Sequence, residues 1–441
     1  MEEGRIIKRK RILFAFIMLF LLLPMIQQKF EIISLKSLKG SFSYVAYTDF
    51  SVPGWFDATF QSNQEEYLKE RIGFRSFFVR INNQIDYSFS GKANANNVLV
   101  GKDDFLFSKP YISTYLGGDY VGDEFINDKL FKLKEIKDTL FKKNIDLIVV
   151  IAPGKGSFYP EYFPESFRAE IKSISNYEAY IEGFNINDVY CLDFNEWFKQ
   201  LKDTSIYPLY PKNGIHWSAY GEYLAADSII GYIEFLRDIK LPQLELKEIE
   251  LSSRCRFSDQ DIEDGMNLLF DIPDLEMAYP IFEIVEDENT VSPKVLTIAD
   301  SFYWGMFGWG MSTDVFDHSK FWYYNKQIYP DNFKDSVYVD ETTIISEVEK
   351  NEVIMLMSTD RNLFKFAFGF IDQVHRAYFG ESDVVLSIKE KRILEIIKTI
   401  KSSPNWLKSI EERALLKNIS LEEAIRKNAV YVLSKEDNIE N

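Results

Sequence analysis

"IDLIVVIAP", residues 145–153, is a run of apolar residues that is rich in β-branched side chains. A run of this kind, without polar alternation, is typical of a strand buried on both faces of a parallel sheet. Three later segments share this character, and helical patterns such as residues 129–144 alternate with them. The sequence therefore predicts an α/β layered domain with a mainly parallel sheet over residues 97–380. The three segments are "DVYCLDF" (188–194), "KVLTIADSF" (294–302) and "EVIMLMSTD" (352–360).

The N-terminus carries the pattern of a membrane anchor. A basic stretch, "RIIKRKR" (5–11), precedes the apolar run "ILFAFIMLFLLLPMI" (12–26). The run is short for a bilayer span, but flanking Arg11 and Lys29 can snorkel to the interface. No small-x-small cleavage site follows it, so residues 1–29 are interpreted as an uncleaved signal anchor. The basic end is then cytoplasmic, and the rest of the chain is extracytoplasmic, on the periplasmic side.

The remaining segments are less regular. Residues 30–96 are predicted to form a juxtamembrane helical segment, with one helix over 63–85, and residues 97–107 read as a hairpin. An acidic, irregular excursion covers 239–290. Residues 381–441 have helical patterns and are predicted to form a small helical tail.

Composition excludes several classes of function. The chain has 441 residues and a net charge of −17, and such an acidic surface repels phosphate backbones, so nucleic-acid binding is not expected. Three His and two Cys cannot supply a Cys-rich zinc site, and no spaced ligand motif indicates a metal or a cofactor. Cys191 and Cys255 could pair in an oxidising compartment or remain buried thiols.

Two residues stand out as candidates for chemistry. Ser301 follows the predicted strand "KVLTIAD" directly, and the carboxyl ends of parallel strands are where α/β sheets bind ligands. His216 precedes Ser218, a plausible N-cap for a helix over 219–239. A histidine in a loop before a helix can reach the strand ends. The pair is therefore predicted to act as nucleophile and general base.

Four dispersed motifs resemble one known family. They are "VLVGKDDFLF" (98–107), "IAPGKGSFYPEYFP" (151–164), "GIHWSAYG" (214–221) and "ADSF" (299–302). In this order they resemble the SGNH-hydrolase-like domain of bacterial polysaccharide O-acetyltransferases, of the alginate (AlgX/AlgJ) and "DHHW" type. The resemblance spans about residues 60–380.

The resemblance implies a function. Ser301 would take an acetyl group with His216 as base, and a polysaccharide hydroxyl would then receive it. The acetyl group would come from an integral membrane acyltransferase partner. One alternative is a carbohydrate acetyl esterase that uses the same two residues. A second alternative is a non-catalytic polysaccharide-binding or envelope scaffold.

One departure from the family pattern bears on activity. The family motif is Asp-x-His-Trp, and the position of its Asp is Gly214 here. In Ser-His-Asp chemistry this carboxylate fixes the histidine tautomer and stabilises the imidazolium. Asn213 could orient the ring without stabilising its charge, Asp227 is too far along the helix, and Asp300 is expected to pin its turn. Three further alternatives for the missing carboxylate stay open: a backbone carbonyl that orients His216, a Ser-His dyad without an acid, or an acid from elsewhere in the chain.

Weaker candidates could line the cleft or bind substrate. Lys155 and Tyr159 follow a strand end, and Trp217 adjoins the histidine. Asn325 is a possible donor to an oxyanion. The Gly-rich "WGMFGWGMS" (304–312) lacks the Gly-Lys-Ser/Thr element of a phosphate loop, and its tryptophans could stack on sugar rings or simply pack.

Overall fold

The computed structural model describes residues 2–40, 45–331, 335–380, 396–417, 419 and 421–437. The chain divides into two compact units, Met1–His375 and Arg376–Asn441. The second unit contains α17 (Pro404–Lys417) and α18 (Leu421–Asp437), which pack around small and branched apolar side chains. The start of the predicted tail, residues 381–395, lies outside the described residues, and 396–402 are helical.

The first unit is built on a seven-stranded sheet with the order β10-β9-β8-β7-β11-β3-β4. The strands from β8 to β4 in this order run parallel, whereas β9 and β10 pair antiparallel at one edge. The mainly parallel α/β fold and the four strands predicted from the sequence are therefore confirmed. The bounds are β3 Asp146–Ala152, β4 Tyr190–Asp193, β7 Val295–Ala299, β8 Phe321–Tyr323, β9 Gln327–Tyr329, β10 Val337–Tyr338 and β11 Val353–Thr359.

The central strands are buried on both faces, as their unalternating sequences require. Every residue of β7 and β11 is buried. In β3, Ile148 and Val150 join the core formed with α10 (Phe194–Leu201) and α11 (Ala219–Arg237). Leu147 and Val149 point to the other face and are equally buried. There α6 (Asp123–Phe141) packs on β3, and α9 (Asn176–Ile186) packs on α6.

Shorter elements complete the first unit. The predicted hairpin is confirmed as β1 (Val98–Val100) paired antiparallel with β2 (Leu106–Ser108). The remaining α-helices include α2 Val52–Phe56, α5 Lys109–Tyr115, α7 Lys155–Phe158, α8 Glu165–Arg168, α13 Trp304–Gly308, α14 Ile344–Val348 and α15 Phe370–Phe379.

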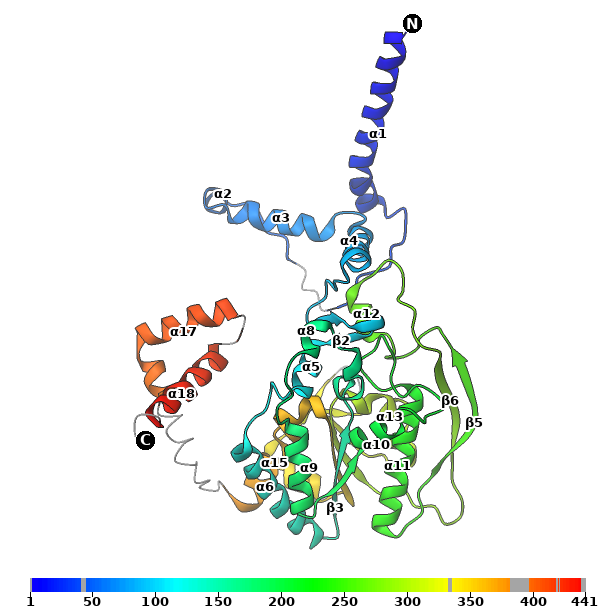
Figure 1. Cartoon of the computed structure of the whole chain (residues 1–441), viewed down its shortest axis with the longest axis vertical. Coiled ribbons are helices and arrows are strands. Elements are labelled where there is room, and N and C mark those ends of the chain that lie inside the picture. The colour runs from blue at the N-terminus through cyan, green and yellow to red at the C-terminus, as the bar shows by residue number, and fades with distance from the viewer. Residues whose placement is uncertain are drawn as a thin grey trace. The chain divides into compact units, whose positions relative to one another are not determined.

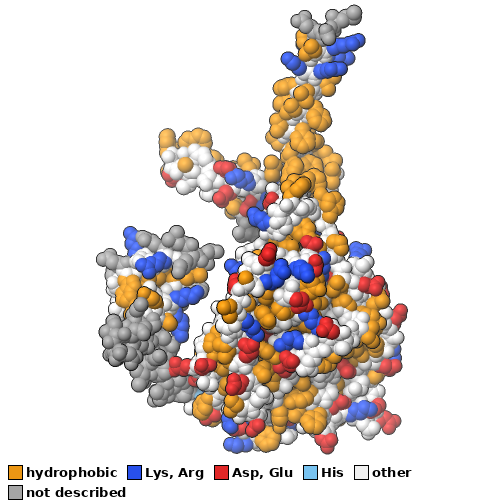
Figure 2. Space-filling view, viewed as in Figure 1, with side chains coloured by type: hydrophobic (Ala, Val, Ile, Leu, Met, Phe, Trp, Pro, Cys, Tyr) orange, Lys and Arg blue, Asp and Glu red, His pale blue; other side chains and the backbone are white. Residues whose placement is uncertain are grey.

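The N-terminal helix has the length and composition of a membrane span. Helix α1 runs over Glu2–Phe30, and its segment Arg5–Phe30 has a mean hydropathy of 1.9 with 6% of the apolar window buried. Figure 2 shows hydrophobic side chains covering this helix and Lys and Arg side chains gathered near its N-terminal end. This distribution is typical of a membrane-spanning helix with a basic flank.

The single helix predicted over 63–85 is wrong, because the structure has two helices there. Helix α3 (Thr59–Arg71) ends before Gly73, and α4 (Arg75–Ser90) begins after Phe74, which has a left-handed backbone with φ 64°. The junction packs against the end of α1. A Cβ on Gly73 would lie 2.0 Å from the Pro24 carbonyl oxygen, so only glycine allows this approach.

The excursion predicted over 239–290 is a two-stranded ribbon with a long connection. Strand β5 (Gln243–Ser252) pairs antiparallel with β6 (Met277–Val285), and the ribbon lies against α11 (Figure 1). The connection, residues 253–276, carries the short helix α12 (Asp261–Met266). Its apolar side chains, among them Ile262 and Met266, pack on Leu106 of β2 and on Ile215. Each such burial stabilises the segment by about 1.5–3 kcal/mol.

Candidate active site

The structure brings the two predicted reactive residues together. Ser301 begins a 3-10 turn just beyond the carboxyl end of β7. His216 lies in the loop before α11, and its Nε2 atom is 2.9 Å from the Ser301 Oγ. This is hydrogen-bonding distance for proton transfer from the hydroxyl to the ring.

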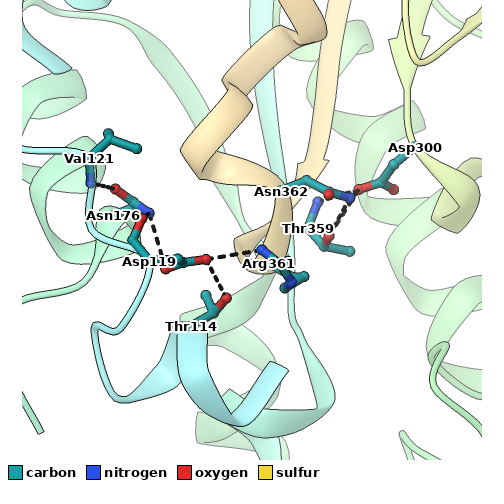
Figure 3. A network of polar contacts seen from close by, with 8 residues as sticks. All are labelled: Thr114, Asp119, Val121, Asn176, Asp300, Thr359, Arg361 and Asn362. Atoms are coloured by element: carbon teal, nitrogen blue, oxygen red, sulfur yellow. Dashed lines mark hydrogen bonds and ion pairs between the residues drawn. The ribbon is translucent and has the colours of Figure 1, made fainter. Parts of the chain in front are cut away.

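Asp300 holds the turn that exposes Ser301. Its Oδ1 accepts a hydrogen bond from the Phe302 amide at 3.1 Å, and its Oδ2 accepts from the Thr359 amide, the Thr359 hydroxyl and the Asn362 amide group at 2.8, 2.9 and 2.7 Å. Figure 3 shows Thr359 and Asn362 turned toward Asp300, whereas Arg361 extends toward Asp119. The expectation that Asp300 pins the turn is therefore confirmed. Asp300 thus accepts four hydrogen bonds, which matches the acceptor capacity of about four sites on a carboxylate.

The loop that carries His216 is fixed at both ends. The Ser218 hydroxyl accepts from the Gly221 amide and donates to the Pro208 carbonyl, so it caps α11 as predicted. On the other side, the buried Lys155 Nζ donates to the carbonyls of Lys212 and Gly214 at 2.6 and 2.7 Å. Burial lowers the pKa of Lys155 to about 7. This lysine therefore fixes the backbone of the histidine loop through two hydrogen bonds to its carbonyl groups.

The missing acid is Asp261, the first residue of α12. Its Oδ2 lies 2.7 Å from His216 Nδ1, and its Oδ1 accepts from the Ile215 amide at 2.8 Å. The side chains of His216 and Asp261 are 19% and 31% exposed. The acid, the histidine and the serine thus form a continuous chain of contacts, in the arrangement of a catalytic triad.

Asp261 lies in the segment 239–290, which was predicted to be an irregular excursion. That segment also fills the place where the family's Asp side chain would lie. A Cβ on Gly214 would be 2.5 Å from the Ser258 carbonyl oxygen and 2.7 Å from that of Asp259. Only glycine fits at position 214, because the backbone of the segment that supplies Asp261 occupies the space that a side chain there would need. A short apolar spacing, Ile262 to Met266, was the one signal of a helix there.

Two sets of hydrogen bonds hold the acid-bearing segment. On the histidine side, Asp274 accepts from the amides of Lys212 and Asn213, and the Asn213 side chain donates to the Ile272 carbonyl. On the N-terminal side, Arg80 and Asn83 of α4 donate to carbonyls of Leu268 and Met266. Contacts of Lys39 with Asp264 and Asn267 add to this second set. The juxtamembrane part of the chain therefore supports the position of the acid.

A neutral donor lies close to the serine. The Tyr324 hydroxyl lies beside the Ser301 side chain, and burial, reinforced by the charge of Asp300, raises the pKa of Tyr324 to about 12. Tyr324 has a left-handed backbone with φ 51°, and its amide donates to the Ala299 carbonyl at 2.9 Å. Such strained positions cluster at functional sites. A protonated phenol here can donate to an oxyanion that forms during attack.

Replacing Tyr324 tests this assignment. We expect Tyr324→Phe to lower kcat for acetyl ester hydrolysis about 10²-fold with little change in KM, because the lost donor acts mainly on the transition state. The matched control is Tyr338→Phe, at an exposed position of β10. Equal loss of kcat in both variants would contradict the assignment.

A cavity of about 610 Å³ opens beside Ser301 and His216. Its walls come from the first turn of α11, the segment at 257–259, the β5–β6 ribbon and α13. Small-molecule sites in proteins commonly have volumes of 300–1,000 Å³. Aromatic side chains dominate the lining, which includes Tyr223, Phe257, Phe282, Trp304 and Trp309. The tryptophans of the Gly-rich stretch at 304–312 therefore line this cavity.

Glu222 places a carboxyl group in this cavity. Its Oε1 accepts from the Trp309 Nε1 at 3.0 Å. A Cβ on Gly305 would lie 1.8 Å from its Oε2, so α13 can approach the carboxyl only through a glycine. Burial raises the pKa of Glu222 to about 7, against the opposing effect of the two indoles of Trp309 and Trp217 and of His216.

Buried carboxyl groups make stability depend on pH. Burial raises the pKa values of Glu222, Asp259 and Glu263 to about 7 and that of Asp360 to about 6. Between their ordinary values and these, the folded state binds more protons than the unfolded state, so these groups favour folding more as the pH falls. We expect the urea midpoint to rise from pH 8 to pH 5.5. Glu222→Gln should raise the midpoint at pH 8 and flatten the change, and exposed Glu248→Gln should not. A lower midpoint for Glu222→Gln at pH 8 would contradict this expectation.

Other predicted site residues have different surroundings. Lys155 and Tyr159 were expected to line the cleft, but both are buried, and the Tyr159 hydroxyl donates to the Tyr210 carbonyl at 3.3 Å. Asn325, expected as an oxyanion donor, gives its amide hydrogens to Gln373 and to the Phe368 carbonyl instead. Trp217 is 2% exposed and packs on Phe302 at the base of the cavity.

The two cysteines are free thiols, Cys191 in β4 and Cys255 in the connection of the ribbon. The Cys255 thiol donates to the Asp274 carboxylate at 3.2 Å. Burial raises the pKa of both thiols above the usual range. Neither is therefore a thiolate at neutral pH.

Comparisons with known proteins agree with the resemblance seen in the sequence. Residues 98–254 match a family described as "SGNH hydrolase-like domain, acetyltransferase AlgX". The resemblance is thereby confirmed, and this part of the chain is similar to that family and has an SGNH-like α/β fold. The match includes His216 and ends before Asp261 and Ser301. The comparison with curated protein sequences found no match to this chain.

Solved structures of low sequence identity are also similar. The O-acetyltransferase domain of Pseudomonas putida AlgJ is 16% identical over 64% of this chain and 99% of its own, with a TM-score of 0.39. Pseudomonas aeruginosa AlgX is 14% identical over 65% and 71%, with a TM-score of 0.42. Bacillus cereus PatB1 is 14% identical over 62% and 99%, with a TM-score of 0.40.

Proposed function

We propose that this chain, whose residues 98–254 match an SGNH hydrolase-like acetyltransferase domain, transfers an acetyl group to a hydroxyl of an exported glycan. The observation that carries the proposal is the chain of contacts from Asp261 through His216 to Ser301. A cavity large enough for a sugar ring adjoins the serine. An intact triad also argues against a scaffold that has lost its acid.

The reaction follows from the geometry of the three residues. His216 Nε2 takes the proton of the Ser301 hydroxyl as Oγ attacks the acetyl carbonyl carbon of the donor. The oxyanion can accept from Tyr324, and the leaving group departs with the proton from the imidazolium. His216 then deprotonates the acceptor hydroxyl, whose oxygen attacks the acetyl-serine. The serine regains its proton, and Asp261 stabilises the imidazolium in both halves.

The N-terminal helix supports an extracytoplasmic location for this site. The basic residues precede the apolar segment of α1, and the orientation rule favours a location outside the cytoplasm for the residues after Phe30. Acetyl donors of the cytoplasm are then out of reach. We therefore propose an integral membrane acyltransferase as the source of the acetyl group. In this arrangement the anchor keeps the site near its donor.

The test uses the full chain in a neutral detergent with an aryl acetate as donor. We expect an increase in mass of one acetyl group on the peptide that contains Ser301. With an oligosaccharide present, acetylated oligosaccharide should form at the expense of free acetate. Release of acetate alone, at every acceptor concentration, would favour an acetyl esterase instead. Turnover that neither labels the Ser301 peptide nor needs the serine would overturn both functions.

A further inference from the structure

The cavity beside Ser301 is suited to a ring. Its exposed wall includes Phe257, which is 84% exposed, and Phe282 packs edge-on against Trp309 with ring centroids 5.2 Å apart. Tyr223 packs against Phe282 from α11, at 5.4 Å. Flat aromatic faces of this kind give large contact areas to a planar or pyranose ring at low entropic cost.

The charged side chains that line this cavity are negative, apart from any proton on His216. Glu222 and Asp259 are the carboxylates among its lining residues, and none of the described residues that line it is a lysine or an arginine. Two cations of adjoining segments, Arg256 and Lys365, have other partners. The Arg256 guanidinium pairs with Glu250, and Lys365 lies over the Tyr324 ring at 4.8 Å. An anion in the cavity would therefore face two carboxylates without a compensating cation.

Both carboxylates are held in place. Glu222 accepts from Trp309 and is confined by the backbone at Gly305. Asp259 accepts from the Tyr279 hydroxyl at 2.7 Å. The Trp217 indole also interacts with Glu222, but a carboxylate has about four acceptor sites, so Glu222 can still accept hydrogen bonds from a ligand. Asp259 is 2% exposed and contributes mainly its negative charge. Hydroxyl and ammonium groups are the donors that suit Glu222.

We propose that this cavity takes the acceptor ring, and that Glu222 and Asp259 restrict it to sugars without an anionic group. Neutral and amine-bearing sugars fit, and uronates and phosphosugars are excluded by like-charge repulsion. The inference rests on the proposed function, because it assigns the acceptor of the same serine. It adds the substrate class, which the triad by itself leaves open.

The experiment measures the charge preference without knowledge of the natural glycan. Three acetyl esters of 4-substituted phenols are compared, with carboxymethyl, hydroxyethyl and trimethylammonioethyl substituents. The full chain in neutral detergent is assayed at pH 8, where both carboxylates are mostly ionised, and each kcat/KM is divided by the rate of alkaline hydrolysis. We expect the carboxylate ester to be at least about tenfold poorer than the other two.

A variant with a matched control tests whether Glu222 causes the preference against the anionic ester. Glu222→Gln keeps the size and the acceptor for Trp309 but removes the charge, and should bring the carboxylate ester within about threefold of the hydroxyl ester. Asp227→Asn removes a charge from the exposed side of the same helix and should leave the ratio unchanged. The wild-type series decides the question even if the Gln variant does not fold.

A second comparison uses acceptors. A neutral gluco-oligosaccharide and the same oligomer oxidised at C6 are supplied with an aryl acetate. Acetylation of the neutral oligomer alone supports the inference. Equal rates for the three esters, or equal acetylation of both oligomers, would overturn it while the proposed function stands. Absence of any turnover that depends on Ser301 would instead remove the proposed function.

Discussion

Ser301→Ala should lower the kcat for aryl acetate hydrolysis by about 10³-fold or more and abolish the acetyl label on the protein. The Ser301 hydroxyl faces His216 and Tyr324, and within the described part of the chain it is the hydroxyl that forms a hydrogen bond with the His216 ring. Without it, the base has no nucleophile to activate. The cavity and Tyr324 remain, so a small residual rate above the uncatalysed reaction is expected.

A measurement of the melting temperature distinguishes the loss of the nucleophile in Ser301→Ala from a loss of folding. Asp300 fixes the turn through its own bonds, none of which uses the Ser301 hydroxyl. The melting temperature of Ser301→Ala should therefore stay close to that of the wild type. Ser346→Ala, at an exposed position of α14, is the matched control. Turnover of Ser301→Ala at the rate of this control would remove the serine from the mechanism.

The sequence predicts those parts of the fold that follow from local patterns. The strands β3, β4, β7 and β11 are visible because burial on both faces demands continuous apolar runs. Ser301 is predictable by related logic, because α/β sheets bind ligands at the carboxyl ends of their strands, and a histidine in a loop before a helix can reach this edge. Neither step needs information about contacts distant in the chain.

The acid and the oxyanion donor were missed for a different physical reason. Asp261 lies 45 residues from His216 along the chain, in an acidic segment whose one helical signal is the spacing of Ile262 and Met266. Its place depends on contacts with residues distant in the sequence, which include the packing of Ile262 and Met266 on Leu106 and the hydrogen bonds from Arg80 and Asn83. Tyr324 depends on a left-handed backbone that no sequence rule assigns to tyrosine. Lys155 was misplaced because a buried lysine held by two carbonyls is rare.

The second large effect is expected for Asp261→Asn. The Asn oxygen can still accept from the Ile215 amide, so the segment should keep its place. Its NH₂ group would then face His216 Nδ1, which favours the tautomer with the proton on Nε2, the atom that must take the proton of Ser301. We expect kcat to fall about 10³–10⁴-fold at nearly unchanged stability. Asp271→Asn, at an exposed position of the same segment, should have wild-type activity.

Gly214→Asp in the Asp261→Asn background distinguishes this triad from that of the family. If the site used the family position, the added carboxylate would restore activity. Here a Cβ at 214 meets the carbonyl oxygens of Ser258 and Asp259 at 2.5 and 2.7 Å, so the side chain must displace the segment that holds α12. We expect no recovery of kcat and a lower melting temperature. Recovery to within about tenfold of wild type would mean that the segment yields readily and that the family's acid position remains usable.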